Sequence, residues 1–226
     1  MLIPIVQGGL FSSLVLDITS NASEQNILTL ATAAGYNAAT DDTAIIVNIA
    51  SGVTISGSST HALRTGALNA DSDLTINITG SVDGFTGANG GIVAQAGSAG
   101  GDALFFETST GGTGTYVVNV LSGGSLRGGG GGGGGGGQRG SRYEFAGKSE
   151  CGGSIFYGSY GSTGAVNGFG QAGSQGGTGT FGGGYVGCEI TYPGAGGSGG
   201  AAGFAARFNG RSVTVNNSGT VAGSTA

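Results

Sequence analysis

The sequence LTINITGSVDG at residues 74–84 is one of four copies of a strand-and-turn pattern that decides the fold. Each copy is a short apolar strand that closes on Asn, followed by a turn of small residues with Gly, then Val, Ile or Leu, one further residue and Gly. The other copies are IIVNIASGVTISG at 45–57, YVVNVLSGGSLRG at 116–128 and VTVNNSGTVAG at 213–223. Four similar units predict rungs that stack into a β-solenoid, in which each rung buries the next.

The alternation within each copy predicts which side chains are buried. Successive side chains of a strand point to opposite faces, so the apolar residues beside each Asn fall on a face that the rungs repeat. These residues are Val47, Ile49, Ile76, Ile78, Val118 and Val120. A β-sandwich with turn-rich loops accounts for the same short strands and stays open as the alternative.

The spacing of the copies is irregular. Their Asn residues lie 29, 42 and 97 residues apart, at Asn48, Asn77, Asn119 and Asn216. Large insertions must therefore leave the stack. The fold expected is mainly β, with an irregular solenoid-like or sandwich platform.

One short helix is expected ahead of these strands, from Asn21 to Ala34. Asn21 can act as the N-cap, and Glu24 falls at the capping-box position three residues later. Gly35 supplies the stop. The apolar residues that share a face of this helix are Ile27, Leu28, Ala31 and Ala34.

The largest insertion, residues 128–210, is rich in glycine. The chain has 55 Gly and 2 Pro in 226 residues without the period of collagen, and ten consecutive glycines stand at 128–137. Interleaved aromatic residues, and the return to the strand pattern at 213, argue against a flexible linker. Ordering glycine costs about 1 kcal/mol or more per residue, so a collective packing must offset it. We expect a lattice of polyproline-II-type helices, which pack closely because they lack Cβ atoms.

Three turns between the glycine runs carry most of the charge of this region. They are QRGSRYEFAGKSE at 138–150, SIFYGSY at 154–160 and YVGCEITYP at 185–193. We expect these turns to be exposed and to hold the binding surface. The candidate binding residues are Arg139, Arg142, Tyr143, Phe145, Lys148, Phe156, Tyr157, Tyr160, Tyr185 and Tyr192.

Composition disfavours nucleic-acid binding and catalysis. The net charge is −5 and the 7 basic residues are scattered, so the basic surface of a nucleic-acid binder is missing. His61 is the single histidine and is interpreted as a surface loop residue. Neither an activated cysteine nor a nucleophile elbow is present. We predict that the chain is not an enzyme and has no cofactor.

The sequence also bears on metal binding, disulfide formation and membrane insertion. Turn carboxylates that could supply oxygen ligands to calcium are Asp41, Asp42, Asp71 and Asp73. The preferred interpretation is that they are solvated, and no metal site is predicted. Cys151 and Cys188 can pair only if the fold brings them together, so a disulfide and two free thiols both stay open. No run approaches the ~20 apolar residues of a membrane-spanning helix, so no membrane insertion is expected.

The order of these features resembles the glycine-rich receptor-binding modules of tailed phages. These are the adhesins at the tip of T-even-like long tail fibres and the C-terminal parts of tail-tip host-specificity proteins. A helix ending in AAGYNAATDDTA is followed by SGVTISG, by ALRTGALNADSDLTINITGSVDG, by a loop closing on GGDAL and by a strand that enters the polyglycine block. The similarity covers about residues 26–223.

The resemblance implies a virion structural protein. In the T-even-like adhesins the glycine segments form a lattice of polyproline-II-type helices, and turns at one end contact the bacterial receptor. The receptor implied here is a surface polysaccharide or an outer-membrane protein. Analogy with fibres implies a homotrimer, with contacts to other virion proteins through residues 1–20. Those residues do not clearly match the N-terminal part of the T-even adhesin, which caps a trimeric fibre.

We therefore expect three parts. They are a docking segment at 1–20, a β platform at 21–127 completed by 211–226, and a glycine-rich receptor-binding module at 128–210. An architectural virion component, such as a capsid fibre, decoration or baseplate protein, is the alternative. An ice-binding protein is a third hypothesis, which the thin supply of regularly spaced Thr disfavours.

Overall fold

The chain divides into two compact units, which are described separately. The computed structural model describes residues 13–91, 93–108, 112–143, 155–157, 159–160, 162–165, 167–181 and 188–226. Unit 1 comprises Met1–Phe85, Gly101–Gly129 and Gly203–Ala226. Unit 2 comprises Thr86–Gly100 and Gly130–Ala202. Compared with the expected module at 128–210, the glycine-rich unit also includes residues 86–100 and does not include 128–129 or 203–210.

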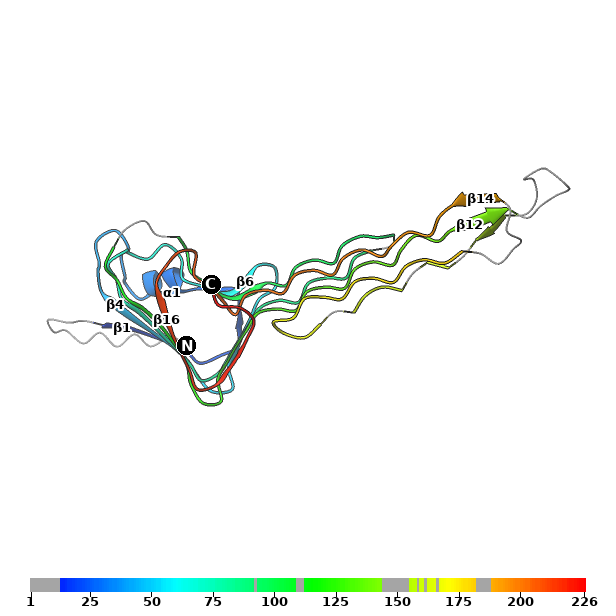
Figure 1. Ribbon diagram of the computed structural model, residues 1–226. Coiled ribbons are helices and arrows are strands. Elements are labelled where there is room, and N and C mark those ends of the chain that lie inside the picture. Colours follow the sequence, from blue (N-terminus) through cyan, green and yellow to red (C-terminus); the bar gives the residue numbers. More distant parts are fainter. Residues whose placement is uncertain are drawn as a thin grey trace, which may run out of the picture. The chain divides into compact units, whose positions relative to one another are not determined.

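Unit 1 is a parallel β-solenoid with three sheets (Figure 1). The first sheet contains β1 (Ser13–Ile18), β4 (Ala44–Ile49), β7 (Leu74–Ile78), β10 (Tyr116–Val120) and β16 (Val213–Asn217), paired in that order. The second contains β2 (Ala22–Ser23), β5 (Thr54–Ser56), β8 (Ser81–Asp83), β11 (Ser125–Arg127) and β17 (Thr220–Ala222). The third contains β3 (Gln25–Asn26), β6 (His61–Arg64), β9 (Asp102–Phe105) and β15 (Ala206–Arg207).

Each turn of the chain adds one strand to each sheet, which makes five rungs. The last rung completes the third sheet with a parallel bridge between Ala206 and Thr225. The solenoid prediction is confirmed, because the strands of the three sheets are parallel and no sandwich of antiparallel sheets is found in the described part of unit 1. The four expected copies are rungs two to five, and β1 begins a first rung whose sequence has Asp17 in place of the repeated Asn.

The strand register of the first sheet places the Asn residues of the four copies side by side. Asn48, Asn77, Asn119 and Asn216 form a ladder in which each side-chain Nδ2 donates to the Oδ1 of the preceding rung at 2.8–2.9 Å. Asn48 donates in turn to Asp17 of β1 at 2.8 Å. Asp17 suits the end of the ladder, because its carboxylate accepts the bond from Asn48. An Asn in its place would carry side-chain N–H groups with no further rung to accept them. A shift of any rung would break these bonds.

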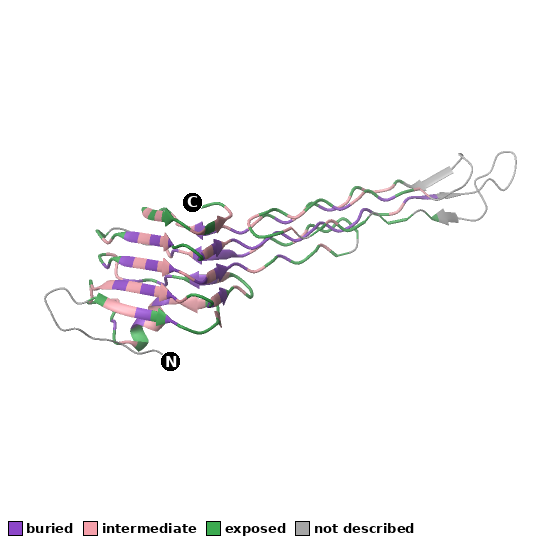
Figure 2. Ribbon diagram, turned by 90° about the horizontal axis from the view of Figure 1, so that it is seen from below, coloured by how far each residue is buried: buried purple, intermediate pink, exposed green. Residues whose placement is uncertain are grey.

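The core of unit 1 lies inside the rungs, where buried and less buried residues alternate along the strands (Figure 2). All six side chains predicted to be buried are 0% exposed. Burying a Val or Ile side chain completely contributes about 1.5–3 kcal/mol. Stacking apolar residues on successive rungs therefore contributes substantially to the stability of the solenoid.

The helix is shorter than predicted and begins later. Helix α1 spans Ile27–Ala33, and its N-cap is Asn26, whose side chain accepts from the Leu28 amide at 3.0 Å. The predicted cap Asn21 instead accepts from the Thr54 amide on the next rung. Glu24 accepts from the amides of the Ser58–Thr60 turn instead of forming a capping box. The C-terminal prediction is confirmed, because Gly35 has a φ of +100° immediately after the C-cap.

The chain leaves and re-enters unit 1 at the same corner in two successive rungs, between the second and third sheets. In the third rung it leaves after β8 at Phe85 and returns at Gly101; in the fourth it leaves after β11 at Gly129 and returns at Gly203. The corresponding corner of the second rung is closed by the short turn 57–60. Both insertions thus start from equivalent positions of stacked rungs.

Unit 2 is a bundle of glycine-rich segments around a central run, 130–140. Five segments surround this run, and each is joined to it by backbone hydrogen bonds: 86–91, 95–100, 162–167, 171–180 and 194–202. The bonds recur every three residues; the amides of Gly131, Gly134 and Gly137, for example, donate to residues 171, 174 and 177. Three residues per turn is the period of a polyproline II helix. The polyproline-II-type lattice stays a prediction, which this period supports.

The five outer segments form an open ring. Backbone bonds join each to the next, except that none connects 86–91 with 162–167 among the described residues. At this opening the Asn89 side chain accepts from the amide of Gly133 at 2.8 Å. A side chain thus takes the place that a sixth segment would occupy.

Glycine is required in unit 2 wherever a residue faces another segment. A Cβ added to Gly132 would meet the carbonyl oxygen of Ala88, and one on Gly134 would meet that of Gly197. Residues 130–137 of the central run have neighbouring segments on every side except at the opening that Asn89 covers, and all of them are glycine. In the outer segment 171–180, the exposed residues that carry side chains include Ala172, Gln175 and Thr178, three residues apart.

A small antiparallel sheet also lies in unit 2. It contains β13 (Ile155–Tyr157), β12 (Ser141–Tyr143) and β14 (Cys188–Thr191), in that order. Strand β12 directly continues the central run. Cys151 lies outside the described residues, so the question of a disulfide with Cys188 stays open.

The ladder predicts a graded effect of Asn substitutions. Asn77→Ala removes two ladder bonds and should lower the free energy of unfolding by about 1–3 kcal/mol, because each bond contributes about 0.5–1.5 kcal/mol. Asn216→Ala removes one bond at the end of the ladder and should cost about half as much. Calorimetric unfolding measures both variants. Equal effects would show that the ladder does not set the register.

The close packing of unit 2 predicts that one methyl group disrupts it. Gly132→Ala should destabilise unit 2 by about 1–3 kcal/mol or more, since two backbones would have to separate. Thr178→Ala, at an outward position, should change stability by less than about 0.5 kcal/mol. Thermal unfolding with amide exchange separates the two units. A wild-type profile for Gly132→Ala would contradict the close packing.

Candidate functional site

Exposed tyrosines gather near the antiparallel sheet of unit 2. Tyr157, Tyr160 and Tyr192 are 56%, 54% and 73% exposed, the highest values among large apolar residues in the described ranges. With Arg139 and Phe181 they form what we call the aromatic tip. Large exposed aromatic groups contribute little to folding, so a cluster of them marks an interaction surface.

Arg139 joins two of the tyrosines. Its guanidinium carbon lies 4.3 Å from the ring centroid of Tyr157 and 5.2 Å from that of Tyr160. Each such cation–π contact contributes about 0.5–1 kcal/mol at an exposed site. Arg139 follows the polyglycine run, whereas both tyrosines come from the strand and turn at 155–160. The contacts therefore fix two turns that are distant in sequence against each other.

The other side of the tip is an aromatic pair. The rings of Phe181 and Tyr192 meet edge to face, with centroids 6.0 Å apart. Gly140 lies against this pair, and a Cβ there would be 2.9 Å from Cδ1 of Phe181 and 2.8 Å from Cδ of Pro193. Gly140 thus gives the aromatic side chains room beside the backbone.

Of the ten predicted binding residues, the structure brings Arg139, Tyr157 and Tyr160 into contact, and Tyr192 packs against Phe181. It assigns Arg142 and Tyr143 to β12 and Phe156 to β13. The predicted residues outside the described ranges are Phe145, Lys148 and Tyr185. Sequence reasoning missed Phe181, which stands between glycine runs and outside the three turns. The sequence feature that could have indicated Phe181 is its position as a single aromatic residue among glycines, in TGTFGGG at 178–184.

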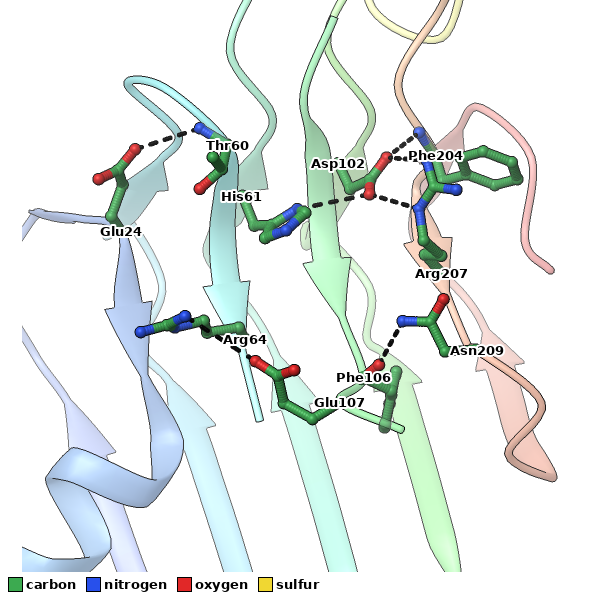
Figure 3. Close-up of polar contacts among 10 residues, drawn as sticks. All are labelled: Glu24, Thr60, His61, Arg64, Asp102, Phe106, Glu107, Phe204, Arg207 and Asn209. Carbon is green, nitrogen blue, oxygen red and sulfur yellow. Dashed lines mark hydrogen bonds and ion pairs between the residues drawn. The ribbon is translucent and has the colours of Figure 1, made fainter. Parts of the chain in front are cut away.

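A group of charged and polar side chains in unit 1 is centred on Asp102 (Figure 3). Asp102 accepts from the Phe204 amide at 2.9 Å and from Nε and Nη2 of Arg207 at 2.7 and 3.1 Å. Nδ1 of His61 lies 3.4 Å from Oδ2 of Asp102, an ion-pair distance without the geometry of a hydrogen bond. The His61 ring stacks on Phe105 with centroids 4.0 Å apart.

This group has a structural role. Asp102 and Phe204 directly follow the two points where the chain returns to unit 1, so their bond ties the returning segments together. Burial alone would raise the pKa of Asp102, but His61, Arg207 and the Phe204 amide together hold it below its usual range. The interpretation of His61 as a surface loop residue was wrong, because His61 begins β6 and is packed between Phe105 and Asp102.

The other sites weighed from sequence are turn elements. Asp71 accepts from the amide and hydroxyl of Thr113, and Asp73 does the same with Thr115. The two bonds from Thr115 lower the pKa of Asp73. In the described ranges, no three His, Cys, Asp or Glu side chains are grouped as metal ligands would be. No helix of the described residues is long and apolar enough to span a membrane.

The charge group of unit 1 predicts a defined pH dependence. The pKa of Asp102 in the folded protein lies below its unfolded value of about 3.9. Ionised Asp102 therefore contributes fully to the free energy of unfolding above about pH 4, and this contribution is lost as the pH falls through the folded pKa. Asp102→Asn should therefore cost about 2 kcal/mol or more at pH 7, and the difference from wild type should shrink between pH 4 and 2. Thermal unfolding at several pH values tests this. A difference independent of pH would contradict the assignment.

Comparisons with known proteins identify one family and one solved structure with a similar fold. The family described as phage tail fibre adhesin Gp38 matches residues 13–226. The gp37-gp38 adhesin tip complex of the bacteriophage S16 long tail fibre, a solved structure, matches with a TM-score of 0.50 and 20% identity. The match covers 94% of this chain and 82% of the other. No curated protein matches.

Proposed function

We propose that the aromatic tip binds the host receptor, from the premise that this chain belongs to the Gp38 family of phage tail fibre adhesins. As a tail fibre adhesin, it is a virion component that acts in host recognition. This agrees with the resemblance seen in the sequence. The family and the fold point to a structural protein rather than an enzyme. The binding residues and the receptor are our proposal.

The observations that support the tip are its exposed tyrosines and the arginine held against two of them. Tyr and Arg dominate the energetics of protein recognition, because they combine large contact area with hydrogen-bonding groups. Tyr157, Tyr160 and Tyr192 expose more than half of their surface, and Arg139 is held against two of them. Such preorganised side chains lose little conformational entropy on binding. A bacterial surface polysaccharide or an outer-membrane protein is the proposed receptor.

Attachment to the virion is proposed to involve residues 1–20. The S16 structure is a complex of gp37 and gp38, which supports another virion protein as a partner here. Residues 13–18 form β1, the first strand of the solenoid, while residues 1–12 lie outside the described ranges. A homotrimer stays an expectation from fibre analogy.

The tip can be tested with matched aromatic substitutions. Arg139→Ala, Tyr157→Ala and Tyr192→Ala should each weaken binding of the purified protein to host cells by about tenfold or more, as interface anchors do. Phe169→Ala is the control, because Phe169 is also an exposed aromatic residue of unit 2 but lies in the turn before the segment 171–180. Equilibrium binding to a panel of bacterial strains gives the affinities.

Two results would contradict the proposal. If Arg139→Ala, Tyr157→Ala and Tyr192→Ala all bound as wild type does, as the control Phe169→Ala should, the receptor site would lie elsewhere. If purified protein bound no strain and acted only within a particle, the architectural alternative would replace the receptor-binding role.

A further inference from the structure

Thr180 connects the two halves of the Arg139–tyrosine cluster. Its carbonyl oxygen accepts from the amide of Gly140, the neighbour of Arg139, at 3.0 Å. Its amide donates to the carbonyl oxygen of Ser159 at 2.9 Å. Its hydroxyl Oγ1 accepts from the amide of Ser159, also at 2.9 Å. One residue thus holds the backbone beside Arg139 and the backbone beside Tyr160.

The hydroxyl bond of Thr180 repeats a bond found farther down the same segment. Ser174 lies six residues earlier, and its Oγ accepts from the amide of Ala165 at 2.6 Å. Both bonds join segment 171–180 to the antiparallel chain opposite. Six residues at three per turn are two turns, or about 19 Å in a polyproline II helix. Ser174, which is also exposed, therefore makes the same kind of contact farther along the bundle, away from the tip.

We propose that Thr180 is a positioning residue of the receptor site. This inference rests on the proposed function of the aromatic tip. The hydroxyl of Thr180 fixes the amide of Ser159, and Tyr160 is the next residue. The bond therefore sets the direction in which the chain presents Tyr160 to Arg139. Thr180 itself is exposed, so its side chain has no core to support.

The consequence of losing this bond is local. Without the hydroxyl, the Ser159 amide can bond to water instead, and the Thr180 amide still holds Ser159 by its carbonyl. The bundle should keep its stability, while the turn that carries Tyr160 samples more conformations. A receptor must then order that turn on binding, which lowers affinity without removing any contact.

Three variants test the inference. Thr180→Val keeps the shape of the side chain but lacks the acceptor, and it should weaken host-cell binding about three- to tenfold. Thr180→Ser keeps the hydroxyl and should bind as wild type does. Ser174→Ala removes the equivalent bond inside the bundle and should also bind as wild type does. Hydrogen exchange of the Ser159 amide should speed up in Thr180→Val and not in the other two variants.

The outcomes separate this inference from the proposed function. Wild-type affinity for Thr180→Val, or equal weakening in Thr180→Val and Thr180→Ser, would overturn the positioning role. So would equal weakening in Ser174→Ala, which would indicate a general effect of bundle stability. If Arg139→Ala and Tyr157→Ala also bound as wild type does, the receptor site itself would be wrong. Weakening confined to Thr180→Val, with faster Ser159 exchange, supports the inference.

Discussion

The register between successive rungs of unit 1 is the constraint on which the other features depend. Parallel strands with similar sequences can slip, and a shift by one residue would turn every core side chain outward. The ladder from Asp17 to Asn216 prevents this, because each amide side chain bonds to its counterparts on the adjacent rungs. With the register fixed, the chain leaves the solenoid after Phe85 and after Gly129, at equivalent corners of adjacent rungs. The glycine insertions therefore begin and end in paired positions.

Unit 2 replaces side-chain packing with backbone packing. Its segments bury almost no apolar side chains around the central run, and their cohesion comes from hydrogen bonds that repeat every three residues. This packing depends on the absence of Cβ atoms, which lets carbonyl oxygens of one segment approach the α-carbons of another. Residues with side chains are confined to outward positions, to the opening that Asn89 covers and to the tip. In unit 2, positions that face another segment are therefore glycine, and positions that face outward can carry side chains.

The sequence predicted the parts of this fold that depend on local repetition. The Asn pattern identified four rungs and their buried residues, and glycine content identified the bundle. The first rung was not predicted, because it has Asp17 where the other rungs have Asn. The helix start was misplaced because Glu24 bonds to a turn 34–36 residues later in the chain, a contact that no local pattern indicates. At the tip, composition indicated Arg139 and the tyrosines, but their contacts, and the place of Phe181, depend on which segments lie side by side.

The three-residue period of unit 2 also restricts how such a chain can change in length. Removing one residue from the central run would turn everything after it by a third of a turn and bring side chains against backbones. Removing three residues from each adjoining segment would restore every hydrogen bond and shorten the bundle by about 9 Å. The length of this unit can therefore change only in steps of three residues, which are nine nucleotides of coding sequence. The same change must occur in every segment that is hydrogen-bonded at that point of the bundle.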